Sequence, residues 1–338
     1  MKYVSKKPKD GKILTMIYSE VIIVGGGPAG STCAWKLRRS GIECLILDKE
    51  EFPRHKLCAG WITPKVVKDL EIDFNDYPHG LVSIDKIYVN IFGVKLKIKT
   101  HQYSIRRYEF DDWLLKRAGV PVYTHYIENI RKENDRYIID DRFCCRYLIG
   151  AGGTFCPVYR TFFEPINPRA KANRIVALEE EFKYAFEEKD CHLWFFENKL
   201  PGYSWYVPKG NGYLNIGVGG ISEGLRSPGK TIQNHWNRFV QKLSDLSLVK
   251  EYNFNPKGCL YYLRDGIKDV QIGNAFVIGD AAGLATRDLG VGIGPAVKSG
   301  LLAADAIING KKYDASVIKK YSIPQILASI LKGGERRV

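Results

Sequence analysis

Residues 21–30 read Val-Ile-Ile-Val-Gly-Gly-Gly-Pro-Ala-Gly, and this stretch decides the fold of the chain. An apolar run rich in β-branched residues leads into a glycine turn, which predicts a buried strand that ends there. The pattern then predicts a helix from Ala29 to about Ser40 and a second apolar run that ends at Asp48. Strand, helix, strand and terminal acid in this order are typical of a β-α-β unit that binds a dinucleotide.

Each glycine of this turn has its own physical reason. Gly25 permits the tight turn, Gly27 lets the backbone approach a pyrophosphate, and Gly30 lets the helix pack against the strand. The pyrophosphate is expected at the unpaired N–H groups of the helix N-terminus. Asp48 is expected to bind a ribose hydroxyl, and its charge disfavours a 2′-phosphate at that place.

Length and composition indicate a soluble globular protein of two domains. The 338 residues are 45% apolar and 26% charged, and they contain no run of eighteen apolar residues that could span a membrane. The net charge of +14 comes from 51 basic and 37 acidic residues, an excess that favours acidic partners or reflects a generally basic proteome. The basic residues are dispersed and form no nucleic-acid-binding motif, so we expect no nucleic-acid partner.

The first part of the sequence and the cysteines exclude two further classes. Residues 1–18 are predicted to form a basic tail, because the apolar core at residues 13–17 is too short for a signal peptide. The eight cysteines include no CxxC pair and no His/Cys ligand spacing, which argues against a metal site and fits a reducing, cytoplasmic setting. Cys144 and Cys145 are adjacent and would face opposite sides of a strand.

A second nucleotide-type stretch lies late in the sequence. Residues 275–278 predict a buried strand that leads into Gly279 and Asp280, and residues 289–294 open a helix that runs to about Asn309. An NAD dehydrogenase does not need this second glycine turn. An extended FAD would be bound by it, because Asp280 can bind a ribityl hydroxyl and the helix N-terminus can point N–H groups at the flavin. We therefore predict FAD, with NAD(P)H or a reduced electron carrier as transient donor, since no second GxGxxG follows a strand.

The chain as a whole predicts an α/β fold. A Rossmann-like FAD-binding domain with a parallel sheet is interleaved with a substrate domain built on an antiparallel sheet. Aromatic-rich strands over residues 175–219 suit a wall of an apolar pocket, and a helical stretch over residues 315–331 has an apolar face that packs on protein or touches a membrane surface. The predicted boundaries are 1–18 for the tail, 19–60, 101–155 and 265–312 for the FAD-binding domain, 61–100 and 156–264 for the substrate domain, and 313–338 for a C-terminal helix and tail.

Several motifs together resemble one family. They are Gly25–Gly30 with Asp48, Pro53–Gly60, Arg107-x-x-Phe110-Asp111-x-x-Leu114, Tyr203-x-Trp205-x-Val207-Pro208, Gly217-x-Gly219 and Gly279–Gly283. On these motifs, which run through most of the chain, it resembles the geranylgeranyl reductase family, within the FAD-dependent flavoproteins of p-hydroxybenzoate hydroxylase fold. The Tyr-x-Trp segment is the most specific of them.

The resemblance implies reduction of isolated carbon–carbon double bonds in polyprenyl chains, by hydride from flavin N5 and a positioned proton source. Cys58 is the candidate proton source and Tyr203 the next, while packing is the alternative role of Cys58. The FAD contacts are expected at Gly25, Gly27, Ala29, Gly30, Asp48, Lys49, Arg107, Gly279, Asp280, Gly290, Gly292 and Ile293. The apolar substrate is expected at Tyr203, Trp205, Val207, Pro208, Gly217 and Gly219.

Departures from the family leave alternatives open. Arg287 and Val291 stand where the family usually has Pro and Glu. Arg287 could stabilise the reduced flavin, hold an acidic substrate group or pair with Asp288. A flavin monooxygenase acting on an aromatic substrate and an electron-transfer flavoprotein without substrate turnover are the competing functions. An apolar substrate is compatible with peripheral membrane contact as well as with a cytoplasmic protein.

Overall fold

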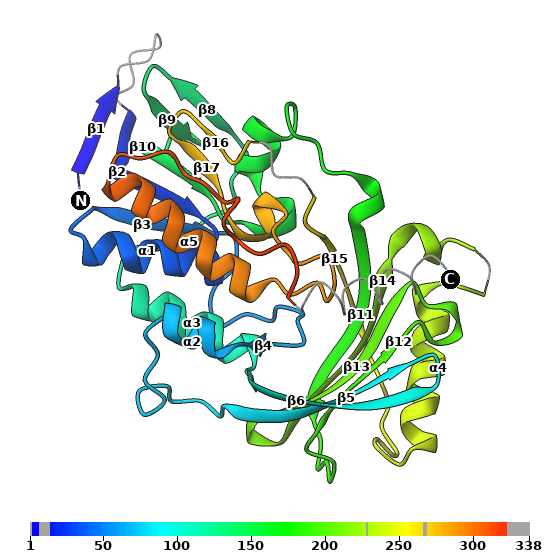
Figure 1. The fold of residues 1–338 in the computed structure, drawn as a ribbon. Coiled ribbons are helices and arrows are strands. Elements are labelled where there is room, and N and C mark those ends of the chain that lie inside the picture. Colours follow the sequence, from blue (N-terminus) through cyan, green and yellow to red (C-terminus); the bar gives the residue numbers. More distant parts are fainter. Residues whose placement is uncertain (1, 7–13, 228, 266–268, 323–338) are drawn as a thin grey trace.

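The computed structural model describes residues 2–6, 14–227, 229–265 and 269–322. Within these ranges the chain forms two β-sheets, of nine and eight strands. The nine-stranded sheet lies at the upper left of Figure 1 and the eight-stranded sheet at the lower right. The chain runs from the first sheet to the second and back twice, since β1–β3, β7–β10 and β16–β17 build the first sheet and β4–β6 and β11–β15 build the second.

The nine-stranded sheet has a parallel centre. Its central order is β16 (Gln271–Ile272), β17 (Ala275–Val277), β10 (Phe143–Gly150), β2 (Leu14–Val24), β3 (Cys44–Asp48) and β7 (Val122–Thr124). β1 (Lys2–Lys6) pairs with β2, and β8 (Ile130–Glu133) and β9 (Arg136–Ile139) extend the sheet from β10. From β17 to β7 all neighbouring strands are parallel. Every residue of β3 is buried, as expected for a parallel strand covered on both faces.

Five α-helices lie within the described residues, and two of them begin at the glycine turns, as the sequence predicts. They are α1 (Pro28–Arg39), α2 (Pro64–Asp69), α3 (Arg107–Ala118), α4 (Ile232–Asp245) and α5 (Ile293–Ile308). Proline occupies the first position of α1 and α2, where its missing N–H costs no hydrogen bond. Thr63 and Thr231 cap α2 and α4 by accepting N–H groups of the first turn.

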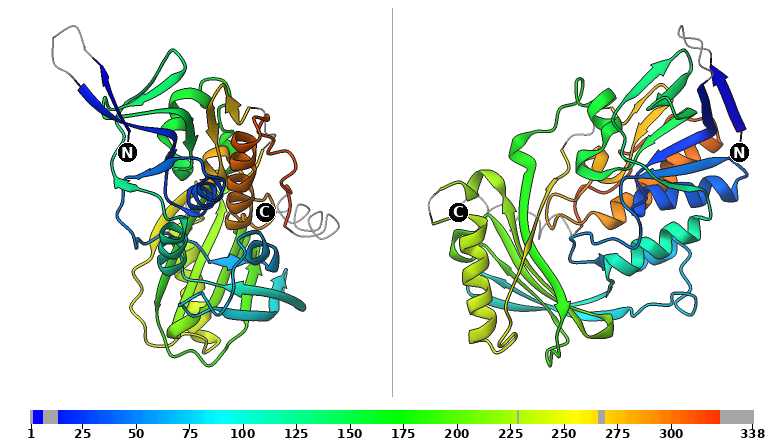
Figure 2. Two further views of the ribbon diagram at one scale, coloured as in Figure 1. Left: turned by 90° about the vertical axis from the view of Figure 1, so that its left-hand side faces the viewer. Right: turned by 180° about the vertical axis from the view of Figure 1, so that it is seen from behind.

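The eight-stranded sheet is antiparallel except at one pair. Its order is β15 (Lys257–Tyr262), β11 (Arg174–Lys183), β14 (Tyr213–Ile221), β13 (Gly202–Lys209), β12 (Cys191–Phe195), β5 (Val82–Ile91), β6 (Val94–Ser104) and β4 (Trp61–Ile62). Only β12 and β5 pair in parallel. Helix α4 stands along the outer side of this sheet, as the right-hand view of Figure 2 shows. The interleaved α/β fold with a parallel and a largely antiparallel sheet is confirmed.

The two faces of the second sheet bury different sets of side chains. On the outer face Trp194, Tyr206 and Val218 pack against Trp236 and Phe239 of α4. The opposite face, which we call the inner face, carries an apolar cluster of its own that leads toward the first sheet. This cluster comprises Ile84, Ile87, Val89, Ala177, Cys191, Leu193, Phe195, Phe196, Trp205 and Val207.

Two segments differ from the sequence prediction. Residues 14–18 were assigned to a basic tail, but they are part of β2 and pair with β1, because their apolar side chains continue the strand pattern. Residues 315–322 form turns rather than the start of a helix, and residues 323–331 of that predicted helix lie outside the described residues. Cys144 and Cys145 do face opposite sides of β10, since they belong to separate buried clusters.

Candidate active site

The glycine turn after β2 leaves no room for side chains. Gly25 has a φ of +113°, and a Cβ built on it would lie 2.5 Å from the carbonyl carbon of Ala151. A Cβ built on Gly30 would lie 1.9 Å from the carbonyl oxygen of Gly25. Only glycine fits both positions, so α1 begins directly against the end of β2.

Asp48 holds this turn in place. Its Oδ2 accepts the N–H of Gly26 at 2.6 Å, and its Oδ1 accepts the N–H of Glu50 at 3.0 Å. The acid therefore lies beside the N-terminus of α1, where the sequence placed it. Lys49, predicted to join the same site, has a side chain that is 65% exposed and pairs with Glu50 at 3.4 Å.

The second glycine turn lies directly beside the first. A Cβ built on Gly279 would lie 3.0 Å from Cβ of Ala29, so the turn after β17 touches the first turn of α1. Asp280 reaches the start of α5, because its Oδ1 lies 3.3 Å from a Cβ built on Gly292. The two glycine turns, some 250 residues apart in the sequence, thus lie together. We call this site the cradle: it comprises the two turns, the N-termini of α1 and α5, and the acids Asp48 and Asp280. These residues fit an extended dinucleotide, whose negative charge the helix N-termini favour.

Arg54 adds a cation to this cradle. Its guanidinium lies 4.5 Å above the ring of Phe52, its Nη1 is 3.3 Å from Asp111, and its Nη2 is 3.4 Å from a Cβ built on Gly27. The guanidinium is therefore next to the N-terminus of α1. In the sequence, Arg54 belongs only to the Pro53–Gly60 motif. An irregular loop has no helical or strand periodicity from which the position of its side chain could be predicted.

The loop that carries Cys58 is held by two buried cations. Arg107 forms two 2.6 Å bonds to Asp111, and its guanidinium also lies beside the Cys58 thiol. Lys209 is buried and donates to the carbonyl oxygens of Ala59 and, at 2.9 Å, Ile105. Burial lowers the pKa of Lys209. Together these contacts fix the loop between α3 and the second sheet.

Trp205 lies flat on the inner face of the second sheet. A Cβ built on Gly217 would lie 2.1 Å from Cζ2 of the indole, and one built on Gly219 would lie 3.5 Å from its Cζ3. The two glycines of the Gly-x-Gly motif therefore make the space in which the indole sits. The indole Nε1 donates to Oδ1 of Asn215 at 2.8 Å, and Tyr203 donates to the carbonyl of Leu289 at 2.6 Å, just before the start of α5.

One predicted pocket residue lies on the other face. Because side chains alternate along a strand, Tyr203, Trp205 and Val207 share the inner face. Pro208 is paired with Leu214 on the outer face, and its carbonyl accepts the hydroxyl of Ser104 at 2.6 Å.

Glu179 is a site residue that the sequence analysis missed. It lies on β11, is only 3% exposed, and its Oε1 accepts the backbone N–H of Cys58. Burial raises the pKa of Glu179 to about 7, against the lowering effects of the Cys58 N–H, Lys209 and Asn215. Nothing in the sequence distinguishes one of the three consecutive glutamates at residues 179–181, and only the register of β11 shows that Glu179 faces inward.

Arg287 does not pair with Asp288. Its Nη1 lies 3.8 Å from Asp265, while the Asp288 carboxylate accepts the N–H and, at 2.8 Å, the hydroxyl of Ser322. Of the three alternatives for Arg287, the structure does not show the pairing with Asp288, and the Arg287 side chain remains one-third exposed.

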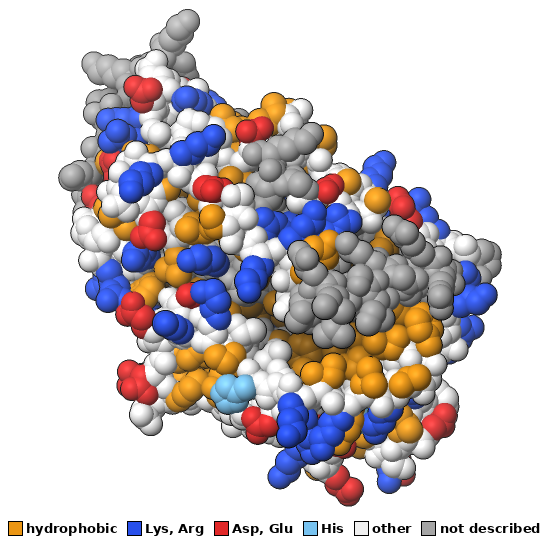
Figure 3. All heavy atoms as spheres, viewed as in Figure 1, with side chains coloured by type: hydrophobic (Ala, Val, Ile, Leu, Met, Phe, Trp, Pro, Cys, Tyr) orange, Lys and Arg blue, Asp and Glu red, His pale blue; other side chains and the backbone are white. Residues whose placement is uncertain are grey.

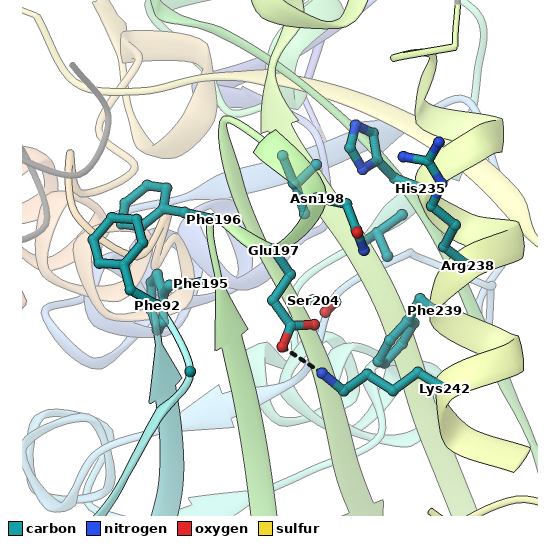
Figure 4. Close-up of a pocket in the computed structure, with 13 residues that line it drawn as sticks. Phe92, Phe195, Phe196, Glu197, Asn198, Ser204, His235, Arg238, Phe239 and Lys242 are labelled. Carbon is teal, nitrogen blue, oxygen red and sulfur yellow. Dashed lines mark hydrogen bonds and ion pairs between the residues drawn. The ribbon is translucent and has the colours of Figure 1, made fainter. Parts of the chain in front are cut away.

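A separate cavity of 390 Å³ lies between the sheet and α4, and it extends from the outer-face residues Ser204 and Val218 to Phe195 and Phe196 of the inner-face cluster. Figure 4 shows its aromatic end at Phe92, Phe195 and Phe196 and its polar end at α4, where Lys242 pairs with Glu197. It does not include the Cys58 loop or Trp205, so it is distinct from the cradle. Over the part of the chain that is described, no cluster of side chains could hold a metal ion. The helices of these described ranges also lack the length and apolar character that a membrane span requires.

Glu179 gives a testable pH dependence of stability. Its folded pKa of about 7 lies above the ordinary value of 4.5 for a glutamate, so its stabilising contribution is full at acidic pH and is lost as the pH rises through 7. Between pH values below and above this window, we expect wild type to lose about 3 kcal/mol of unfolding free energy relative to Glu179→Gln. Urea unfolding across this range measures it, with Glu180→Gln, on the opposite face of the strand, as the matched control. Equal pH dependence in all three proteins would contradict the prediction.

Comparison with known proteins agrees with this geometry. Residues 23–83 match the family described as NAD(P)-binding Rossmann-like domain. The chain is 31% identical over 325 residues to an uncharacterized protein of Methanosarcina barkeri, a match that covers 89% of this chain and 77% of that protein. It is 27% identical over 335 residues to digeranylgeranylglycerophospholipid reductase 1 of Methanopyrus kandleri, covering 89% and 84% of the two chains.

A solved structure shares the fold. The crystal structure of a geranylgeranyl bacteriochlorophyll reductase-like protein from Thermoplasma acidophilum superimposes with a TM-score of 0.75 at 21% identity, covering 95% of this chain and 84% of that one. The same two-sheet arrangement therefore occurs in a protein named for this group of reductases. The chain belongs to the geranylgeranyl reductase family of FAD-dependent oxidoreductases.

Proposed function

We propose that this chain reduces carbon–carbon double bonds of an apolar, isoprenoid or lipid-like substrate. The observation that carries this proposal is a continuous apolar path across the inner face of the second sheet. It begins at Trp205, beside the Cys58 loop, and ends at the exposed strand β6.

The strand register defines this path. Trp205 lies opposite Leu193, which lies opposite Val89, which lies opposite Leu96 of β6. The next row runs in the same way from Tyr203 through Phe195 and Ile91 to Val94. Directly paired residues share a face, so both rows lie on the inner face.

The far end of the path is open. Val94, Leu96 and Ile98 are 58%, 45% and 39% exposed. Figure 3 shows hydrophobic side chains gathered over the region of β5, β6 and β12. A path that is buried near the Cys58 loop and open at the sheet edge suits a long apolar chain, whose burial there is favourable by about 0.8 kcal/mol per CH₂. An exposed apolar edge would also let the protein contact a membrane surface to collect such a substrate.

The cradle described above would hold FAD. The turn from Gly25 to Gly30 with Asp48 would bind the adenosine half, Arg54 the pyrophosphate, and Asp280 with the start of α5 the flavin half. FAD, when bound and reduced, supplies a hydride. Tyr203, Trp205 and the Cys58 loop would enclose the reacting region. The donor that reduces FAD stays a prediction: NAD(P)H or a reduced electron carrier.

An anaerobic assay tests this function. Dithionite-reduced, FAD-loaded protein mixed with geranylgeraniol should reoxidise without oxygen, and mass spectrometry should find product heavier by two hydrogens for each bond reduced. A protein that stays reduced with this substrate, yet hydroxylates an aromatic compound once oxygen is added, is a monooxygenase. A protein that is reduced and passes electrons to a carrier, with neither product formed, is an electron-transfer flavoprotein.

The substrate path makes a separate prediction. Leu96→Glu places a carboxylate on the exposed end of the inner face, whereas Lys97→Glu places one on the outer face of the same strand. Leu96→Glu removes the apolar contact that the leucine side chain would make with the bound substrate. We therefore expect this variant to raise KM for geranylgeraniol about tenfold. Steady-state kinetics with both variants measures the effect, and an equal change in Lys97→Glu would argue against the path.

Arg54 makes a prediction about cofactor affinity. Arg54→Ala removes a cation beside the N-terminus of α1. Because a charge-assisted hydrogen bond to the pyrophosphate is lost, we expect FAD to bind about tenfold more weakly. Flavin fluorescence titration of the apo protein measures the Kd. The control is Arg39→Ala, which removes an exposed arginine paired with Glu71 at the other end of α1. Unchanged FAD affinity in Arg54→Ala would show that the pyrophosphate does not bind at this arginine.

A further inference from the structure

We propose that Glu179 is the acid that delivers the proton to the double bond, a role that rests on the reductase function proposed above. Saturation of an isolated double bond adds a hydride to one carbon and a proton to the other. The hydride comes with the reduced cofactor, so the chain must provide the proton.

The position of Glu179 fits this task. Its register partner on β14 is Gly217, which lies opposite Trp205 on β13, so the carboxyl and the indole occupy one row of the inner face. Because Gly217 has no side chain, nothing in that row stands between them except the indole itself. Glu179 therefore lies at the buried start of the apolar path, directly under the Cys58 loop.

The surroundings of Glu179 favour its neutral form. It is buried and, among the described residues, has no ion pair. Two lysines lie on the same side of the sheet: Lys209, whose ammonium group donates to the carbonyl oxygens of Ala59 and Ile105, and Lys257, the exposed register partner of Glu179 on β15. Glu181 on the same strand disfavours a second negative charge. The other titratable neighbours, Tyr203, Cys259 and Cys58, bring no positive charge.

Cys58 has different neighbours. Its sulfur accepts the N–H of Gly60 at 3.3 Å and lies beside the Arg107 guanidinium. Both neighbours are hydrogen-bond donors, so the sulfur acts as an acceptor in this loop. The proton source that we propose is therefore the carboxyl below the loop rather than this thiol.

The transfer balances in atoms and electrons. The π electrons of the double bond and the incoming hydride together make two new C–H bonds. One uses the hydride with its electron pair, and the other uses the proton of neutral Glu179, whose O–H bond breaks. Glu179 is left as a buried carboxylate, which regains a proton from solvent before the next turnover.

Single-turnover kinetics tests the role. Full-length, FAD-loaded, dithionite-reduced wild type, Glu179→Gln and Glu180→Gln are mixed anaerobically with geranylgeraniol from about pH 6 to about pH 9. We expect Glu179→Gln to be slower than wild type by about 100-fold, because general-acid transfer is lost. The wild-type and Glu180→Gln rates should fall above pH 7, and the residual rate of Glu179→Gln should not. A Glu179→Gln protein with the wild-type rate and pH profile would overturn the proposal.

Infrared spectroscopy of the apo protein gives a readout without turnover. The C=O stretch of a protonated carboxylic acid should be present at about pH 6 in wild type and Glu180→Gln, vanish at about pH 9, and be absent from Glu179→Gln. If wild type reduces no double bond, the reductase function fails on that result alone. The infrared titration still reports on Glu179, and a carboxylate already ionised at about pH 6 would overturn its role as acid.

Discussion

The close approach of two glycine turns is the contact on which the rest of the structure depends. Gly279 packs against Ala29, and Gly30 packs against Gly25, so that the start of α1 lies against α5. A Cβ on Gly300 would lie 2.4 Å from the carbonyl oxygen of Ala29, which shows how closely the two helices then pass. Because both helices are fixed here, their N-termini and the acids Asp48 and Asp280 face one cradle.

The second sheet is tied to this cradle by buried polar contacts rather than by apolar packing alone. Lys209 reaches from β13 to the loop at Ala59, and Glu179 reaches from β11 to Cys58. An isolated buried charge is costly, so each group bonds to backbone atoms of the loop. These contacts place the loop over the inner face, and they put a carboxyl where an acid is needed for the proposed chemistry.

Local patterns in the sequence were sufficient for the fold and for both glycine turns. The apolar run before Gly25, Thr63 and Pro64 at a helix start, and the small residues after Gly290 each specify structure within a few residues. Glu179, Lys209 and Arg54 could not be placed in this way. Their roles depend on which strands pair and on how the loop folds back, and these are contacts between segments far apart in the chain.

A structure of the FAD-loaded protein with geranylgeraniol bound would show where the substrate lies. We expect the prenyl chain on the inner face of the second sheet, with one end at Trp205 and Glu179 and the other toward Leu96. A prenyl chain found instead in the cavity between the sheet and α4 would rule out the substrate path.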